Sequence, residues 1–394
     1  MFRFFILTMA LIGSLAAAPL QAARSQQDWQ QGNRFDAEAM VRQGIGYVQA
    51  KQYQSAVETF QRVLQAYPNA PVAYVGLGMA YGGLGQHREA GSAFEQAIRL
   101  QPNYFEAYLY LGSSRLALDQ PQEAMTIFRQ AADMNPMNPY VYFGIGSAYN
   151  GLSQFREAVA ALGRAQQLGL NSAEVAQGLS YAYGSLGQYA EALEAARQVV
   201  RLMPQEFTGY LNLSFAHERL DQHEEALAAA KEAVRLQPDS AHAYLTIGYV
   251  LNQLGRSQES VEASEQALRW KKEPRHEALA RYNLGNSYNK LNQKARALES
   301  FQQAVASFRI TPKMSADEYF YFGNACLQIE QNDAAITAFR EAIRQRPNFS
   351  QPYLSLGITY TTLGNKRAAL EIYESLKTLD PARAARLSKA INGK

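Results

Sequence analysis

The sequence repeats with a period of 34 residues, and this period constrains the fold more than any other feature of the chain. Ten rows of 34 residues, written from Ala37, account for residues 37–383 when two short offsets are allowed. One offset, residues 275–277, precedes the eighth row, and the other, residues 312–315, precedes the ninth. A repeat of this length indicates one small structural unit stacked many times, so the period and not the length of 394 residues defines the organisation.

Two columns of small residues predict that each row forms a pair of antiparallel helices. A glycine inside a helix costs about 1 kcal/mol relative to alanine, so a close approach of two backbones must offset that cost. The eighth place of the rows holds Gly44, Gly78, Gly112, Gly146, Ser180, Ser214, Gly248, Gly285, Gly323 and Gly357. The twentieth place holds Ala56, Ala90, Ala124, Ala158, Ala192, Ala226, Ser260, Ala297, Ala335 and Ala369. One small residue therefore falls on each helix of a hairpin, and the predicted fold class is all-α.

Other columns supply the core and the ends of the helices. Tyrosine fills the fourth place in seven rows and the eleventh in six, and phenylalanine fills the twenty-fourth in five. These columns predict one apolar seam per hairpin. Glycine, aspartate or asparagine at the fifteenth place of seven rows suits a helix end, and proline at the thirty-second place of seven rows cannot continue a helix. After the second offset, Ser315 and Glu318 form the pattern of a capping box.

The second row shows the pattern almost complete. Its defining residues are Tyr74, Leu77, Gly78, Tyr81, Ala90, Phe94, Ala97 and Pro102. This pattern resembles the tetratricopeptide repeat family, and the resemblance extends over residues 37–383. The resemblance implies a right-handed α-solenoid of about ten helix–turn–helix repeats, whose first helices line a concave groove that binds other proteins. Rows four, seven and eight depart from the pattern at the thirty-second place, with Leu170, Lys272 and Arg309.

The first residues form a segment of a different kind. Arg3 is followed by the apolar run Phe4–Leu15 and by small residues up to Ala23, which predicts a signal peptide cleaved after Ala22. An uncleaved membrane anchor is the alternative, but the 17 mainly apolar residues of Phe4–Leu20 fall short of the roughly 20 that a spanning helix needs. We expect the mature protein in the periplasm or outside the cell. The predicted segments are a signal peptide (1–22), a polar tether (23–36), repeats one to seven (37–274), repeat eight (278–311), repeats nine and ten (316–383), and a C-terminal capping helix and tail (384–394).

The chain offers few residues for chemistry. Its one cysteine, Cys326, occupies a core column and permits neither an intramolecular disulfide nor a cysteine metal site. The five histidines show no metal-like spacing on one helix, and no catalytic pattern lies outside the repeats. With 38 basic and 35 acidic residues, the net charge of +3 gives no reason to expect a nucleic-acid partner. We therefore predict no enzymatic activity, no metal, no cofactor and no integral membrane span once the signal is removed.

The groove can be read from the repeat register. In the family that the chain resembles, places 2, 5, 6, 9, 12 and 13 of each first helix face the groove. An asparagine amide can pair with any peptide backbone, and aromatic rings add apolar area with little loss of rotamer entropy. The candidate groove residues are Tyr110, Tyr140, Phe143, Tyr181, Asn212, Phe215, Tyr249, Asn252, Asn283, Asn286, Asn289, Phe320, Tyr321 and Asn324. Asn212 and Asn283, both at the sixth place, resemble the asparagine ladder of some long superhelical members; the alternative is that these asparagines are merely soluble residues on an exposed helix.

The leading functional hypothesis is a scaffold or adaptor that binds an extended segment of a partner protein in a cell-envelope assembly or export complex. A glycan-binding periplasmic protein is one alternative, since sugars stack on aromatic faces, and a self-assembling structural scaffold is another. The basic residues of the family's carboxylate clamp are absent, because fifth places carry apolar residues such as Leu109 and Phe143. The sequence predicts that replacing Asn283 and Asn286 with alanine weakens partner capture and leaves the melting temperature nearly unchanged.

Overall fold

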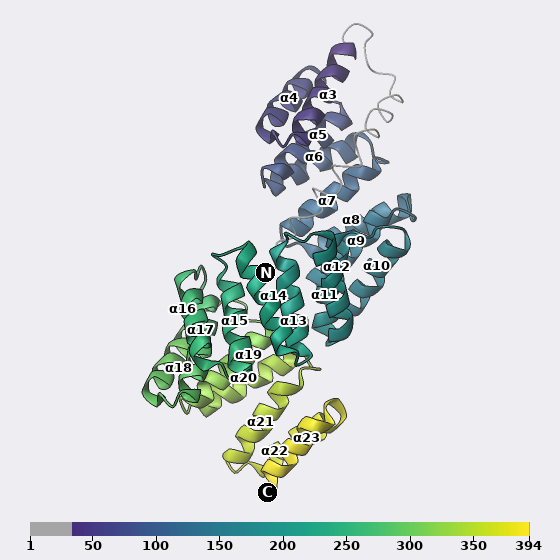
Figure 1. Ribbon diagram of the computed structural model, residues 1–394. Helices are drawn as coiled ribbons and strands as arrows, with labels where there is room; N and C mark the ends of the chain where they lie inside the picture. Colours follow the sequence, from purple (N-terminus) through teal and green to yellow (C-terminus); the bar gives the residue numbers. More distant parts are fainter. Residues whose placement is uncertain (1–33, 394) are drawn as a thin grey trace. The chain divides into compact units, whose positions relative to one another are not determined.

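The computed structural model describes residues 34–393 (Figure 1). The expected signal peptide and nearly all of the expected tether therefore lie outside the described residues. The described residues form 21 α-helices and no strand, which confirms an all-α chain built from helix–turn–helix repeats. Among these helices, none combines the length and the apolar character that crossing a bilayer requires.

The helices alternate between the two positions of a hairpin, and each row of the sequence contains one hairpin. The first helices are α3 (Arg34–Gln49), α5 (Pro71–Gly83), α7 (Phe105–Ala117), α9 (Pro139–Gly151), α11 (Ala173–Leu186), α13 (Phe207–Arg219), α15 (Ala241–Gln253), α17 (Pro274–Lys290), α19 (Ala316–Gln328) and α21 (Ser350–Thr362). The second helices are α4 (Tyr53–Ala66), α6 (His87–Leu100), α8 (Pro121–Met134), α10 (Phe155–Gln167), α12 (Tyr189–Leu202), α14 (His223–Leu236), α16 (Ser257–Arg269), α18 (Lys294–Arg309), α20 (Asn332–Gln345) and α22 (Lys366–Leu379). A final helix, α23 (Pro381–Ile391), follows the tenth hairpin.

The small residues of the eighth place allow a bulky side chain of the second helix to reach the first helix. Phe60, fully buried on α4, lies against Gly44 of its own hairpin and against Gly76 of the next one. A methyl group added at Gly44 or Gly76 would lie 2.6 Å or 2.2 Å from Cζ of the Phe60 ring, so neither position has room for a side chain. Phe128 occupies the same position in the third hairpin. One ring therefore closes its own hairpin and also joins it to the next.

Every hairpin turns at the fifteenth place of its row, where the backbone is left-handed. In all ten rows, φ at this place lies between 57° and 78°. Seven rows carry the expected glycine, aspartate or asparagine there. The other three carry Lys51, Ser153 and Glu330, whose side chains make this conformation less favourable. Packing of the two helices therefore imposes the turn even where the local sequence does not favour it.

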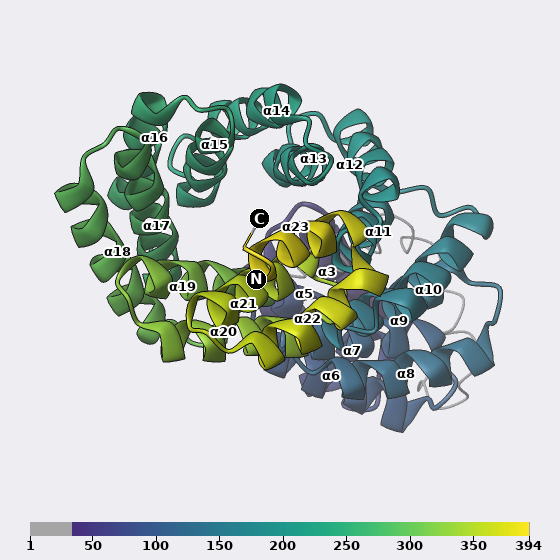
Figure 2. The same cartoon turned by 90° about the horizontal axis from the view of Figure 1, so that it is seen from below.

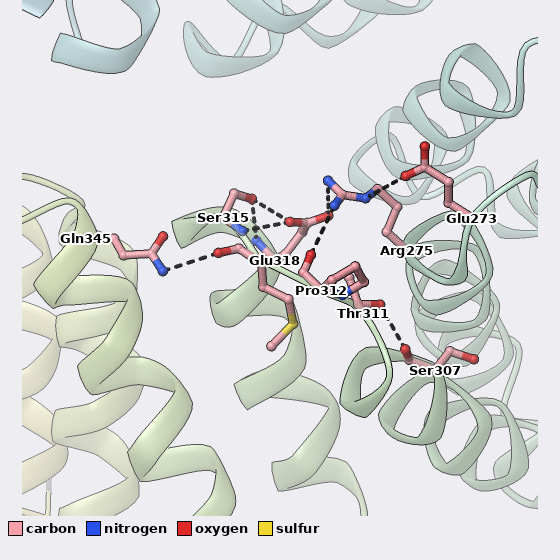
Figure 3. A network of polar contacts seen from close by, with 9 residues as sticks. Glu273, Arg275, Ser307, Thr311, Pro312, Ser315, Glu318 and Gln345 are labelled. Atoms are coloured by element: carbon pink, nitrogen blue, oxygen red, sulfur yellow. Dashed lines mark hydrogen bonds and ion pairs between the residues drawn. The ribbon is translucent and has the colours of Figure 1, made fainter. Parts of the chain in front are cut away.

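The two offsets of the repeat register contact each other (Figure 3). The first offset, residues 275–277, is helical and lengthens α17 to 17 residues, so it does not form part of a turn. Arg275 donates from Nη2 to the carbonyl oxygen of Pro312 in the second offset, 3.3 Å away, and its Nη1 lies 3.4 Å from Oε1 of buried Glu318. Ser315 and Glu318 form the predicted capping box, with the Ser315 amide 2.7 Å from Glu318 Oε2. The extra residues of the two rows are thus accommodated together.

Helix α23 covers the apolar end of the last hairpin. Leu387 is fully buried and lies against Gly357, where an added methyl group would be 2.4 Å from the leucine Cδ2 atom. Leu387 thus contacts the eighth-place glycine of the tenth hairpin, as Phe60 contacts Gly44 in the first. The helix begins at Pro381, three residues before the predicted segment 384–394.

The chain divides into two compact units between Tyr183 and Gly184, inside α11. Within the second unit, helices α13, α15, α17 and α19 lie on the inner side of a curved row of hairpins, and α14, α16 and α18 lie on the outer side (Figure 2). We define the inner face of the second unit as the side chains that α13, α15, α17 and α19 present on this inner side.

Candidate binding surface

The first unit holds four of the predicted groove residues, and two of them are buried. Tyr110 is only 1% exposed and stacks on Phe94 of the preceding hairpin, with ring centroids 5.4 Å apart. Phe143 is buried as well. The prediction that these two side chains face an open groove is therefore wrong. Tyr140 is half-buried, and Tyr181 is exposed with its ring 5.6 Å from that of Phe155.

Tyr110 is buried because its place in the row meets the preceding hairpin. In the second and fourth rows the sixth place is a glycine, Gly76 or Gly144, and a phenylalanine of the hairpin before fills the space above it. In the third row the sixth place is Tyr110, and its ring stacks on the corresponding phenylalanine, Phe94, instead. The sixth place is thus a contact between successive hairpins in this part of the chain and not a groove position.

Two of the predicted asparagines connect α15 to α17. Asn252 and Asn283 are each 4% exposed. Asn252 donates from Nδ2 to the backbone oxygen of Asn283 at 3.0 Å, and Asn283 donates from Nδ2 to the backbone oxygen of Leu245 at 3.1 Å. Ser287 donates to Oδ1 of Asn252 at 3.0 Å. Because their amides already satisfy buried polar groups of the chain itself, these asparagines are not available for a guest, and that part of the prediction is wrong.

The remaining predicted asparagines lie nearer the surface. Asn286 and Asn324 hydrogen-bond to the hydroxyl of Tyr282, and Asn289 is exposed and donates to Oε1 of Gln328 at 3.2 Å. Asn212, at the same place in its row as Asn283, has no hydrogen-bond partner for its enclosed Nδ2 atom. The four asparagines belong to α13, α17 and α19, so amide groups recur along successive first helices of the second unit.

Aromatic side chains of three successive first helices gather on this face. The ring of Tyr321 on α19 lies 6.0 Å from Tyr249 on α15, 5.2 Å from Tyr282 on α17 and 5.6 Å from Phe320, measured between ring centroids. Phe215 on α13 is 39% exposed. The structure therefore brings Tyr249, Phe320 and Tyr321 together with Tyr282, and all four occupy groove places of their rows.

A set of charged and aromatic residues that the sequence analysis did not single out borders this cluster. Arg219 at the end of α13 donates to the Tyr189 hydroxyl at 2.9 Å, and its guanidinium lies 5.5 Å from the centre of the Phe349 ring. Arg346 lies 3.9 Å from the same ring and pairs with Asp317 at 2.6 Å. A signal for part of this set existed in the sequence, because Arg219 and Asp317 occupy groove places of their rows.

The repeat pattern and the packing of the hairpins agree with comparisons to known proteins. Sequence profiles described as tetratricopeptide repeat match residues 38–70, 75–139, 173–206, 207–240, 239–310 and 350–383, and one described as TPR repeat matches residues 323–364. The chain belongs to the tetratricopeptide repeat (TPR) family. TPR proteins bind other proteins and are typically non-catalytic scaffolds, so the family assigns the chain to the protein–protein interaction scaffolds.

Solved TPR structures resemble parts of the chain. A tetratricopeptide repeat protein from Parabacteroides merdae ATCC 43184 matches with a TM-score of 0.52 and 16% identity, over 65% of this chain and 98% of the other. PilW, described as a widely conserved type IV pilus biogenesis factor, matches with a TM-score of 0.49 and 19% identity, over 52% of this chain and 96% of PilW. MamA from Desulfovibrio magneticus RS-1 matches with a TM-score of 0.40 and 20% identity, over 42% and 94%. The first likeness shows a shared fold alone. A search among curated proteins found no match.

Burial changes the ionisation of several groups on the inner face of this TPR protein. Burial raises the pKa of the Glu218 carboxyl above its ordinary value, and the adjacent Arg219 opposes that shift. Burial also raises the pKa of Tyr249, whose hydroxyl hydrogen-bonds to Glu218. Tyr321 and Tyr282 have raised pKa values for the same reason. These tyrosines stay protonated at neutral pH, and the hydroxyls of Tyr249 and Tyr282 are already bonded to Glu218 and to the amides of Asn286 and Asn324.

The environment of Cys326 and the distribution of metal-ligating side chains bear on possible chemistry. Burial raises the pKa of the Cys326 thiol to about 11, so this side chain is a protonated core residue at neutral pH. Within the described residues, no three histidine, cysteine, aspartate or glutamate side chains come together in a way that could hold a metal ion.

Proposed function

We propose that this TPR protein binds an extended segment of a partner protein on the inner face of its second unit, and that it does so as an adaptor in a cell-envelope assembly or export complex. The observation that carries the first part is the aromatic cluster of Tyr249, Tyr282, Phe320 and Tyr321, with the amides of Asn286 and Asn324 beside it. The cluster spans three first helices, as a guest lying across successive hairpins requires.

The chemistry of this face fits a peptide. Aromatic side chains contribute large contact areas at a low cost in conformational entropy, and such residues dominate the binding energy of many interfaces. The amides of Asn286 and Asn324 bond only to a tyrosine hydroxyl, which leaves donors and acceptors for a backbone. An extended backbone exposes one donor and one acceptor per residue, so amides placed on neighbouring helices match its repeat without selecting a side chain.

Site-specific crosslinking tests this part of the proposal. Photoreactive benzoylphenylalanine replaces Phe215 on α13 or Asn289 on α17, both of which are exposed and lie on first helices. Leu298 on α18, 45% exposed on a second helix, is the matched control position. We expect the first two positions to capture the same partner protein and the control to capture none. Mass spectrometry should place the two crosslinks on one continuous partner segment, at separate points along it.

Other outcomes distinguish the alternatives. Adducts that contain carbohydrate and no peptide would support the glycan-binding hypothesis, and adducts with a second copy of this chain would support a self-assembling scaffold. Crosslinks from Leu298 that equal those from Phe215 would contradict a binding surface on the inner face.

The proposed location rests on the apolar segment near the start of the sequence, which is typical of an export signal. Expression of the full-length chain in a Gram-negative host, followed by osmotic shock, should release a protein whose first residue is Ala23. A product that keeps residues 1–22 and sediments with the membrane would support the uncleaved anchor instead, and a product retained in the cytoplasm would contradict export.

A further inference from the structure

Hairpins that are far apart in the sequence contact each other across the inner face of the second unit. Asn348, in the turn before α21, donates from Nδ2 to the backbone oxygen of Leu186 at the end of α11, 3.0 Å away and 162 positions earlier. The guanidinium of Arg219 lies 5.5 Å from the ring of Phe349, 130 positions later. In a TPR array each repeat packs mainly on the repeats next to it. Packing between neighbouring hairpins therefore does not account for these two contacts.

Arg219 holds one side of this contact. It donates to the hydroxyl of Tyr189 at 2.9 Å, and its guanidinium lies 5.0 Å from the centre of the same ring. Glu218, the residue before it, hydrogen-bonds to Tyr249 on α15. Tyr189 on α12 therefore holds the guanidinium, which also lies 6.0 Å from the ring of Phe215 on its own helix.

Arg346 and Phe349 hold the other side. Arg346 lies 3.9 Å above the Phe349 ring and pairs with Asp317 on α19 at 2.6 Å. Phe349 is buried, and its ring also lies 5.4 Å from Phe320. A cation is attracted to the face of an aromatic ring, and this attraction is stronger where water is excluded. Phe349 thus lies close to two arginines that come from opposite ends of the second unit.

The aromatic cluster also connects helices that are far apart in the sequence. Tyr249 on α15 hydrogen-bonds to Glu218 on α13 and contacts Tyr321 on α19, so a single side chain connects the two ends. The groups that would meet a guest are therefore in contact with each other in the free protein.

We propose that a latch holds α12–α13 against the α20–α21 turn and keeps the inner face of the second unit closed to a guest. The latch consists of Arg219, Phe349 and Arg346, together with the Asn348 contact to Leu186. This inference deepens the proposed function, on which the role of the latch in admitting a guest depends. A guest that binds only the open form must compete with the latch, so its apparent affinity falls with the fraction of open molecules.

The latch is tested without any guest, by measuring a distance inside the chain. Cysteines replace exposed Ala190 on α12 and exposed Arg344 on α20, each four positions from the Leu186–Asn348 contact, and carry nitroxide labels for pulsed electron spin resonance. Native Cys326 remains unlabelled because it is fully buried. The wild-type background should give one narrow distribution at short distance, and Arg219→Gln should give a broader distribution with a longer mean.

Arg201→Gln is the matched control, because Arg201 carries the same charge in the same unit but is exposed, with only a 3.7 Å ion pair to Glu194. It should reproduce the wild-type distribution. Circular dichroism first establishes that each variant retains its helix content. If Arg219→Gln fails to fold, Asn348→Ala takes its place, because the Asn348 side chain is exposed and its loss removes only the bond to Leu186.

A distribution for Arg219→Gln, or for its substitute, that matches the wild type overturns the latch, and so does a broad wild-type distribution. This outcome is separate from the fate of the proposed function. A latch that opens as expected, in a protein whose inner face captures no partner, would contradict the binding function alone.

Discussion

The side chain of Asn252 donates a hydrogen bond to the backbone oxygen of Asn283, 3.0 Å away, across the interface between α15 and α17. Asn150 makes the equivalent bond to Gly178 at 3.0 Å between the fourth and fifth hairpins. Both donors occupy the twelfth place of a row, and both acceptors occupy the sixth place of the next. An asparagine at the twelfth place therefore connects successive first helices of this TPR protein.

Asn283→Ala should lower stability, contrary to what the sequence alone predicts. The substitution removes the buried hydrogen bond from the Asn283 amide to the carbonyl of Leu245, which lies inside α15, at a cost of about 0.5–1.5 kcal/mol. Thermal melting followed by circular dichroism measures the effect. Asn289→Ala, at an exposed side chain of the same helix, is the control and should change the melting temperature little. Equal melting temperatures for the two variants would contradict a structural role for Asn283.

Gly76→Ala should destabilise the first unit through Phe60. The new methyl group would lie 2.2 Å from the ring, and such overpacking of a core typically costs about 1–3 kcal/mol. Adding Phe60→Leu to Gly76→Ala should cost less than the sum of the two single changes, since a smaller side chain makes room. The control is Gly46→Ala on α3, where nothing lies within 4 Å of an added methyl group; it should be neutral or stabilising. Additive effects of the two core changes would show that the positions do not contact each other.

Glu330→Gly should raise stability. Glu330 has φ of 61°, a conformation that costs a side chain roughly 1–2 kcal/mol and that glycine adopts freely. The greater freedom of glycine in the unfolded chain offsets about 0.5–1 kcal/mol of that gain. The reverse change, Gly364→Ala at the same place in the next row, should lower the melting temperature, because φ there is 75°. A loss of stability in Glu330→Gly would mean that the glutamate side chain contributes contacts that outweigh the strain.

Glu218→Gln should gain stability relative to the wild type as the pH rises from 4 to 8. Burial raises the pKa of Glu218 above its ordinary value of 4.5, so the folded chain holds the proton more tightly than the unfolded chain does. The stability that this group contributes is present below pH 4.5 and is lost as the pH rises through the folded-state pKa. Glutamine is neutral throughout and does not incur this loss. Arg219, Asp317, Tyr249 and His223 also act on this carboxyl, and all four remain in the variant.

Melting temperatures at several pH values, measured in parallel for wild type and Glu218→Gln, give the difference directly. Glu194→Gln serves as the control, because Glu194 is exposed and its nearest cations, Arg197 and Arg201, lie 3.6 Å and 3.7 Å away. A difference between wild type and Glu218→Gln that stays constant with pH would contradict a raised pKa of the Glu218 carboxyl.

The 34-residue columns made the hairpins, their turns and the buried phenylalanines predictable, because each of these depends on residues within one row or the next. Phe60 and its glycines illustrate this, since the column of small residues and the column of phenylalanines were both visible in the sequence. The role of the sixth place was not predictable from its own column, because it depends on what the preceding row carries. Tyr110 and Asn283 occupy the same place, yet one stacks on Phe94 and the other donates to Leu245.

The contacts of the latch lay beyond the reach of sequence reasoning for a different reason. Arg219 meets Phe349 only because the small rotations between four successive hairpins add up, and no single row determines that sum. The register did place Arg219 and Asp317 on the groove side. It could not show that these side chains would meet partners from the same chain.

The contact of Arg275 with Pro312 and Glu318 also matters for engineering the array. The two insertions that interrupt the period contact each other, so the eighth row and the residues on both sides of it should be kept together as one unit. A chimera or truncation whose junction falls between residues 275 and 318 would contain one insertion without the other. The buried carboxylate of Glu318 would then lack its ion pair with Arg275. Breakpoints before Pro274 or after α19 keep this pair of insertions intact, although a break before Pro274 also cuts the buried bonds of Asn252 and Asn283 between α15 and α17.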